Sequence, residues 1–264
     1  MPMGARRLRL RKGQRPIRRA LLTLCAGLAL LAPAAAQAET ITAARYAEPT
    51  SRYAHGIFGD AEEWGALEID VEGSPETALK TGPVVRRTIR LFRLPITSVF
   101  EDIAPRLADV DGDGHPEVIV VETDVNRGAS LAIYSASGKM AATPYIGQRN
   151  RWLAPVTVAD LDGDGLVEIA YIDRPHLAKT LRIWRFESGT LSPVANAKGL
   201  TNHRIGDRDI AGGLRTCGAT PEMIVANADW TRLIAVTFDG TTLHKRDIGP
   251  HKGRSSFRDA LSCK

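Results

Sequence analysis

The sequence contains none of the short motifs that mark common catalytic or phosphate-binding sites. It has no G-x-S-x-G nucleophile turn, no H-E-x-x-H metal motif and no glycine-rich phosphate loop. His176 follows Arg174-Pro175 in a stretch expected to connect two strands, where an exposed histidine is the simplest interpretation. These absences favour a binding or scaffold protein over an enzyme.

The chain also has little apolar sequence of membrane-spanning length. The apolar run from Ala20 to Ala36 is shorter than the roughly 20 residues that a span needs. It follows a basic segment, 1–19, with eight Lys or Arg and ends in Ala36-Gln37-Ala38. This pattern predicts a secretory signal peptide over residues 1–38, hence a periplasmic or extracellular protein without a transmembrane segment after cleavage. A membrane anchor is the alternative interpretation, and Arg18-Arg19 leaves both the Sec and the twin-Arg export routes open.

The chain has no excess of positive charge outside that leader. Eight of the 35 basic residues lie in the first 19 positions, which leaves 27 basic against 30 acidic residues in 39–264. A domain with this balance has no overall basic field to attract nucleic acid. We therefore expect no nucleic-acid partner.

Cysteine is rare as well, with three in the whole chain. Cys25 falls in the predicted signal peptide, so Cys217 and Cys263 are the pair that the exported part would keep. In an oxidising compartment such a pair is most simply a disulfide, and two free thiols are the alternative.

The remaining chain, 39–264, has no linker that divides it and contains an internal repeat. ADVDGDGHPEVIV from Ala108 and ADLDGDGLVEIAY from Ala159 are identical at seven of thirteen positions, and their offset is 51 residues. Weaker copies with the same rhythm begin near Asp60 and Asp209. The spacing predicts a single domain with four repeat units, at roughly 51–100, 101–150, 151–201 and 202–250.

Short β-branched runs separated by turn residues follow each repeat start, which is typical of successive antiparallel strands. A unit of this size cannot bury its apolar faces alone, so neighbouring units must stack. The sequence therefore predicts an all-β fold: a β-propeller or partial propeller of about four to five blades, each of three to four antiparallel strands. A two-sheet sandwich is the competing architecture.

The most specific signal is an acidic ladder in each of the two best repeats. Alternate residues of a tight glycine-containing loop can turn their carboxylates toward one centre, where a hard cation such as calcium offsets their repulsion. An EF-hand, which needs Glu at the twelfth loop position, is excluded because Val120 and Tyr171 stand there. The ladder residues are Asp109, Asp111, Asp113 and Glu117 in the first loop and Asp160, Asp162, Asp164 and Glu168 in the second.

These loops resemble those of the FG-GAP/VCBS repeat family, found in the integrin α-subunit propeller and in many exported bacterial proteins. The resemblance implies that the ladder side chains bind calcium, together with the backbone carbonyls of His115 and Leu166. Glu117 and Glu168 replace the more usual Asp at the ninth position. The acidic loops of this sequence match the family pattern well, whereas the FG and GAP signatures of the family are poorly kept.

A ligand site at the rim of the channel is a further hypothesis. If the repeats are blades, the residues that lead into the inner strands gather at one rim, and aromatic and cationic side chains there suit a ligand. The residues expected at this site are Arg151, Trp152, His203 and Arg204. The partner would be an unidentified protein, peptide or glycan. Packing of Trp152 between blades is the simpler interpretation.

Three functions remain compatible with the sequence. The first is an exported calcium-stabilised binding or scaffold module. The second is a secreted propeller enzyme, a hydrolase or lyase acting at the channel rim, and the third is a structural domain of a larger envelope assembly. The fold alone does not choose among them.

Overall fold

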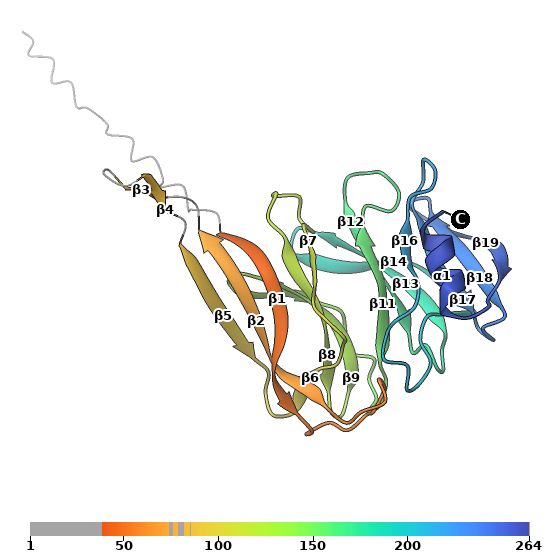
Figure 1. Cartoon of the computed structure of the whole chain (residues 1–264), viewed down its shortest axis with the longest axis horizontal. Helices are drawn as coiled ribbons and strands as arrows, with labels where there is room; N and C mark the ends of the chain where they lie inside the picture. Colours follow the sequence, from red (N-terminus) through yellow and green to blue (C-terminus); the bar gives the residue numbers. More distant parts are fainter. Residues whose placement is uncertain (1–38, 74–75, 79–81, 85, 264) are drawn as a thin grey trace, which may run out of the picture. The chain divides into compact units, whose positions relative to one another are not determined.

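A computed structural model describes residues 39–73, 76–78, 82–84 and 86–263 (Figure 1). The predicted signal peptide, residues 1–38, lies outside the described residues. Almost all regular structure in the described part is antiparallel β-sheet, which confirms the all-β prediction. No helix in these ranges is long and apolar enough to cross a membrane.

The first sheet runs in the order β1-β2-β6-β8-β9-β10, with β5 also paired to β2 and β7 also paired to β8. Its N-terminal strands join the rest through one residue pair, Trp64 opposite Phe100. A separate two-stranded ribbon consists of β3 (Glu76–Ala78) and β4 (Gly82–Val84). The strands of the first sheet are β1 (Glu39–Thr50), β2 (Glu63–Gly73), β5 (Arg87–Arg93), β6 (Ser98–Phe100), β7 (Arg106–Ala108), β8 (Glu117–Asp124), β9 (Gly128–Ser135) and β10 (Gly138–Ala142).

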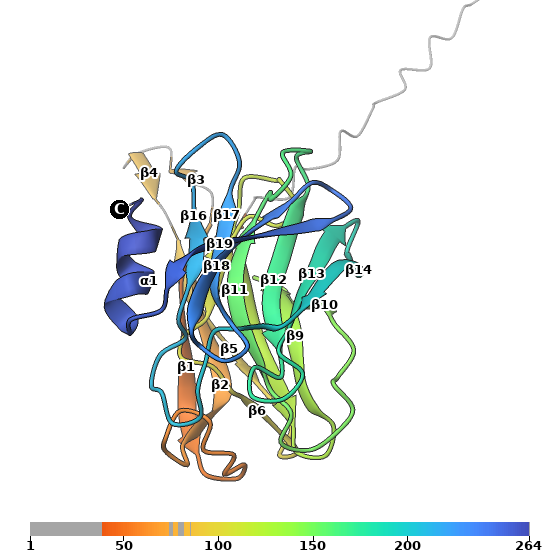
Figure 2. The same ribbon diagram turned by 90° about the vertical axis from the view of Figure 1, so that its right-hand side faces the viewer.

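Two further sheets follow in chain order (Figures 1 and 2). The second is the meander β11 (Leu153–Ala159), β12 (Val167–Asp173), β13 (Thr180–Glu187) and β14 (Thr190–Lys198). The third has the order β15-β17-β18-β19, with β16 also paired to β17, and consists of β15 (Leu200–Thr201), β16 (Gly213–Arg215), β17 (Glu222–Asn227), β18 (Arg232–Phe238) and β19 (Leu243–Pro250). None of these described sheets closes on itself, and the predicted count of four to five blades is not confirmed.

Alternating residues of the inner strands of the second sheet point into different cores, so this sheet is buried on both faces. On β12, Ile169 and Tyr171 pack with the first sheet, whereas Ala170 and Ile172 pack with the third. Side chains of a strand alternate between its two faces, so a continuous apolar run is what a strand inside a stack requires. Packing of neighbouring sheets against one another therefore builds the core.

A short helix, α1 (Arg254–Leu261), covers the outer face of the third sheet. Phe257 and Ala260 of the helix pack with Ile224 and Ala226 of β17. The sequence pattern did not indicate this helix.

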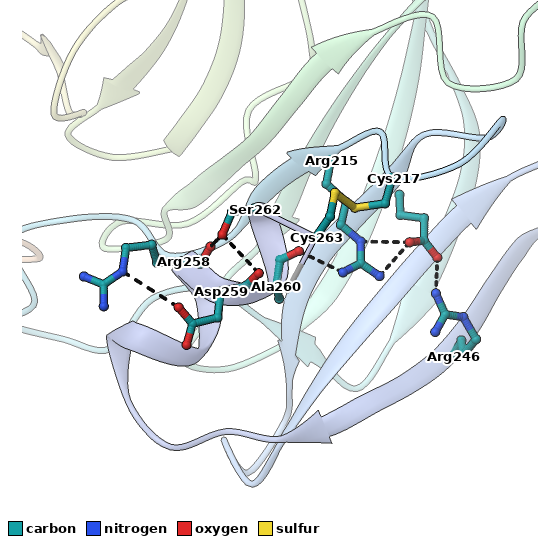
Figure 3. The surroundings of a disulfide bond; sticks show 9 residues. Arg215, Cys217, Arg246, Arg258, Asp259, Ala260, Ser262 and Cys263 are labelled. Atoms are coloured by element: carbon teal, nitrogen blue, oxygen red, sulfur yellow. Dashed lines mark hydrogen bonds and ion pairs between the residues drawn. A yellow bond between two sulfur atoms is a disulfide. The ribbon is translucent and has the colours of Figure 1, made fainter.

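The predicted disulfide between Cys217 and Cys263 is present and ties the end of α1 to the connection between β16 and β17 (Figure 3). Beside it, Arg215 Nη1 donates to the Ala260 carbonyl at 2.8 Å. Arg215 also pairs with Glu222, which Arg246 contacts from β19. The end of α1 is thus fastened to the third sheet by a covalent bond and by a small charge network.

Candidate metal centres

The two acidic loops join equivalent strands of neighbouring sheets. The first connects β7 to β8, and the second connects β11 to β12. Gly112 and Gly114 have φ angles of 76° and 88°, and their counterparts Gly163 and Gly165 have 83° and 88°. These left-handed conformations disfavour residues with a Cβ, which explains why glycine alternates with aspartate in both loops.

The backbone of each loop folds around its own carboxylates. Asp109 accepts hydrogen bonds from the N–H groups of Gly112 at 2.8 Å and Gly114 at 2.9 Å. Glu117 Oε2 accepts from the Val110 N–H at 3.0 Å. These bonds recur in the second loop, where Asp160 and Glu168 accept from Gly163, Gly165 and Leu161 at 2.7, 3.0 and 2.9 Å. The two loops are therefore the same structure built twice.

In each loop three carboxylates converge, with one oxygen from each within 4.8 Å of the others. Asp113 and Asp164 lie outside these groups, and their side chains accept from the N–H groups of His115 at 2.7 Å and Leu166 at 2.8 Å. An all-oxygen, all-anionic donor set is one that a hard divalent cation fits. The converging residues are Asp109, Asp111 and Glu117 in the first loop and Asp160, Asp162 and Glu168 in the second.

Burial makes the glutamate of each loop costly to ionise without a cation. Burial, together with the charges of the three loop aspartates, raises the pKa of Glu117 to about 7, against the opposing Val110 N–H. Burial also raises the pKa of Glu168, but the Leu161 N–H and Arg185 act in the opposite direction. The negative charge of the first loop is thus less compensated by neighbouring groups than that of the second loop.

Arg185 on β13 explains the difference between the loops. Its guanidinium lies 2.6 Å from Glu168 Oε1, 2.6 Å from Asp162 Oδ2 and 2.9 Å from Asp164 Oδ2. The charges that act most strongly on Glu117, by contrast, are those of the aspartates in its own loop. A cation that enters the second loop must therefore compete with the Arg185 guanidinium for the same carboxylates. The sequence pattern did not indicate this contact.

The residues expected at the channel rim are only partly brought together. Trp152 is 2 % exposed, and its indole Nε1 donates to the Glu101 carbonyl at 2.8 Å. His203 is fully buried against the Trp152 ring, with ring centres 5.0 Å apart. Arg151 lines a cavity beside Trp152, whereas the Arg204 guanidinium stacks on Trp230 at 4.4 Å.

Two histidines beside the rim residues have roles that the sequence did not reveal. His176, expected to be exposed, is half-buried, and its Nε2 lies 3.1 Å from His203 Nδ1. His55 Nδ1 lies 2.5 Å from the buried Glu101. Each contact joins connections that lie far apart in the sequence, so no local pattern around either histidine could indicate it.

Comparison with protein families shows that the loop region matches a known repeat. The family model of the FG-GAP-like repeat matches residues 109–171. The chain contains an FG-GAP-like repeat. The matched segment begins at the first aspartate of the first loop and ends beyond Glu168, so it includes all the converging carboxylates. Searches of curated proteins and of solved structures gave no match.

Proposed function

We propose that each acidic loop of the FG-GAP-like repeat region binds one calcium ion. The observation that carries this proposal is the duplication: two loops at equivalent positions of successive repeats hold three converging carboxylates in the same hydrogen-bonded frame. Calcium prefers six to eight oxygen ligands in a flexible arrangement, which loop carboxylates, carbonyls and water can supply together. Asp113, Asp164 and the carbonyls of His115 and Leu166 would complete the set.

The biological role that we infer is that of an exported binding or scaffold module stabilised by these ions, with an unidentified partner. The antiparallel sheets and the FG-GAP-like repeat support a propeller-like framework for binding. The Cys217–Cys263 disulfide supports a periplasmic or extracellular location, because disulfides persist in oxidising compartments. Under this proposal the loops hold the stacked sheets together rather than carry out a reaction.

Calorimetric titration of chelator-treated protein with calcium tests the proposal. We expect two binding events, and a variant with Asp109→Asn and Asp160→Asn should lose both because each loop loses the aspartate around which it folds. Asp259→Asn, which removes an exposed carboxylate of α1, is the control and should bind like the parent. Absence of calcium binding by the parent protein, or equal binding by the loop variant, would refute the assignment.

A further inference from the structure

A cavity of about 270 Å³ opens at the end of the sheets opposite the acidic loops. Trp152 precedes β11 and Asp160 follows it, so the cavity and the second acidic loop lie at opposite ends of one strand. Four connections form its wall: those between β1 and β2, β10 and β11, β12 and β13, and β15 and β16. This volume is close to the lower limit for small-molecule sites, roughly 300 Å³, so it suits a group the size of one residue.

The charged groups of the cavity wall are cationic. Arg151 and Arg174 line it, and none of the described lining residues is acidic. Arg174 is held in place by Asp173, whose two oxygens accept from it at 2.7 and 3.0 Å. Arg151 has no carboxylate partner among the described residues, and its Nη1 donates to the Asn150 carbonyl. The wall therefore offers guanidinium donors to an anion.

Two imidazoles of the cavity wall, those of His176 and His55, have fixed orientations and add hydrogen-bonding capacity. The orientation of His176 is set by His203 behind it. His203 Nε2 donates to the Asp207 carbonyl at 2.9 Å, so Nδ1 of the neutral ring accepts from His176 Nε2. His176 stays neutral near pH 7, since burial and the neighbouring His203 lower its pKa to about 4. Its Nδ1 is then an acceptor. On His55, Nδ1 faces Glu101, which leaves Nε2 for the cavity.

The mouth of the cavity is apolar and exposed. Leu177 is 62 % exposed and Ile205 is 70 % exposed, and both line the cavity together with the buried Ile57. Two large aliphatic side chains held in water at the edge of one cavity are typical of a surface that a partner covers. The site therefore combines a cationic wall, a hydrogen-bond acceptor and an apolar edge.

We propose that this cavity binds the C-terminal residue of a partner peptide whose last side chain is apolar. The peptide carboxylate pairs with Arg151 and Arg174, its final amide N–H donates to His176, and its side chain lies between Leu177 and Ile205. Carboxylate capture with a side-chain pocket is an established mode of peptide recognition. This inference names the partner class for the proposed binding function, and it does not depend on calcium.

The test is calorimetric titration with acetyl-Gly-Gly-Leu and with the same peptide as its C-terminal amide. We expect the free acid to bind at least tenfold more tightly, because the amide lacks the charge. Arg151→Gln should weaken binding of the acid at least tenfold, while Arg149→Gln, at an exposed arginine outside the cavity wall, should leave it unchanged. Acetyl-Gly-Gly-Gly should bind more weakly than the leucine peptide, and Ile205→Ser should remove most of that difference.

Four results would overturn the assignment of this cavity to a peptide C-terminus. Equal affinity for acid and amide, no binding at millimolar peptide, or an unchanged affinity in Arg151→Gln would overturn it. Tighter binding of D-glucuronate than of any peptide acid would also overturn it, in favour of an acidic sugar. Thermal unfolding of each variant with and without calcium distinguishes this failure from that of the calcium proposal, because the loops and the cavity lie at opposite ends of the sheets.

Discussion

The indole Nε1 of Trp152 donates a 2.8 Å hydrogen bond to the backbone carbonyl of Glu101, 51 residues earlier in the chain. This separation equals the offset between the two acidic loops, so equivalent positions of successive repeats meet directly. His203 follows Trp152 at the same spacing and contacts its ring. Glu101, Trp152 and His203 occupy equivalent positions of successive repeats, and their contacts join the sheets at the end opposite the loops.

Replacement of Trp152 should therefore reduce stability before it affects any ligand. Trp152→Ala is expected to lower the free energy of unfolding by about 3–5 kcal/mol, since it leaves a large internal cavity. Trp152→Phe keeps most of the volume but leaves the Glu101 carbonyl unpaired, so the loss should be smaller, about 1–3 kcal/mol. Denaturant unfolding measures both. A Trp152→Ala protein as stable as the parent would show that the ring is not part of the core.

Arg185 should weaken calcium binding by the second loop. In a background with Asp109→Asn and Asp111→Asn, where the first loop is disabled, Arg185→Gln is expected to tighten calcium binding about tenfold by removing a competing charge-assisted contact. Arg182→Gln is the matched control, because Arg182 lies on the same strand but pairs with Asp173. Calorimetry gives the dissociation constants. Weaker binding in Arg185→Gln would mean that the arginine organises the site instead.

Glu63 should make stability fall with rising pH. Burial, together with the nearby Glu101, Asp60 and Asp102, raises its pKa from an ordinary 4.5 to about 9. Between these values the folded state holds a proton that the unfolded state has lost, so stability declines from pH 4.5 to 9 by at most about 1.4 kcal/mol per unit.

Glu63→Gln should remove that decline. The free energy of unfolding of the variant should therefore rise relative to that of the parent protein as the pH increases from 5 to 8.5. Glu62→Gln, at the exposed neighbouring position, is the control and should follow the parent. Urea unfolding at several pH values gives the comparison. A constant difference between parent and Glu63→Gln across this range would show that Glu63 titrates normally.

The disulfide should stabilise the third sheet and its helix. Cys217 and Cys263 are 46 residues apart, and closing a loop of that length contributes roughly 3–4 kcal/mol in the chain-entropy account. The double change to Ala should lower the melting temperature and increase amide hydrogen exchange in α1 more than in β8. Equal exchange in parent and variant would mean that the noncovalent contacts of α1 hold the helix without the disulfide.

The sequence predicted those features that depend on local pattern. The ladders at Asp109 and Asp160 defined both loops, because alternating aspartate and glycine determine the backbone as well as the donor atoms. The short β-branched run after the second loop predicted a strand, and β12 is found there. The disulfide could be predicted because residues 39–264 contain a single pair of cysteines.

The sequence did not predict features that depend on how distant segments meet. The difference between the loops rests on Arg185, which reaches Asp162 from the neighbouring strand β13. Half-burial of His176 requires the connection that carries His203, and nothing beside His176 signals it. Helix α1 has too few apolar residues to be recognised before the sheet face that it covers is known.

Thermal unfolding as a function of free calcium tests the central claim most directly. Chelator-treated protein should melt at a lower temperature than protein in excess calcium, and each loop occupied at 100 times its dissociation constant should add about 2.7 kcal/mol. The double change Asp111→Asn and Asp113→Asn should remove most of the first loop's share, and magnesium should substitute poorly. A melting temperature that does not change from chelator to millimolar calcium would contradict the account.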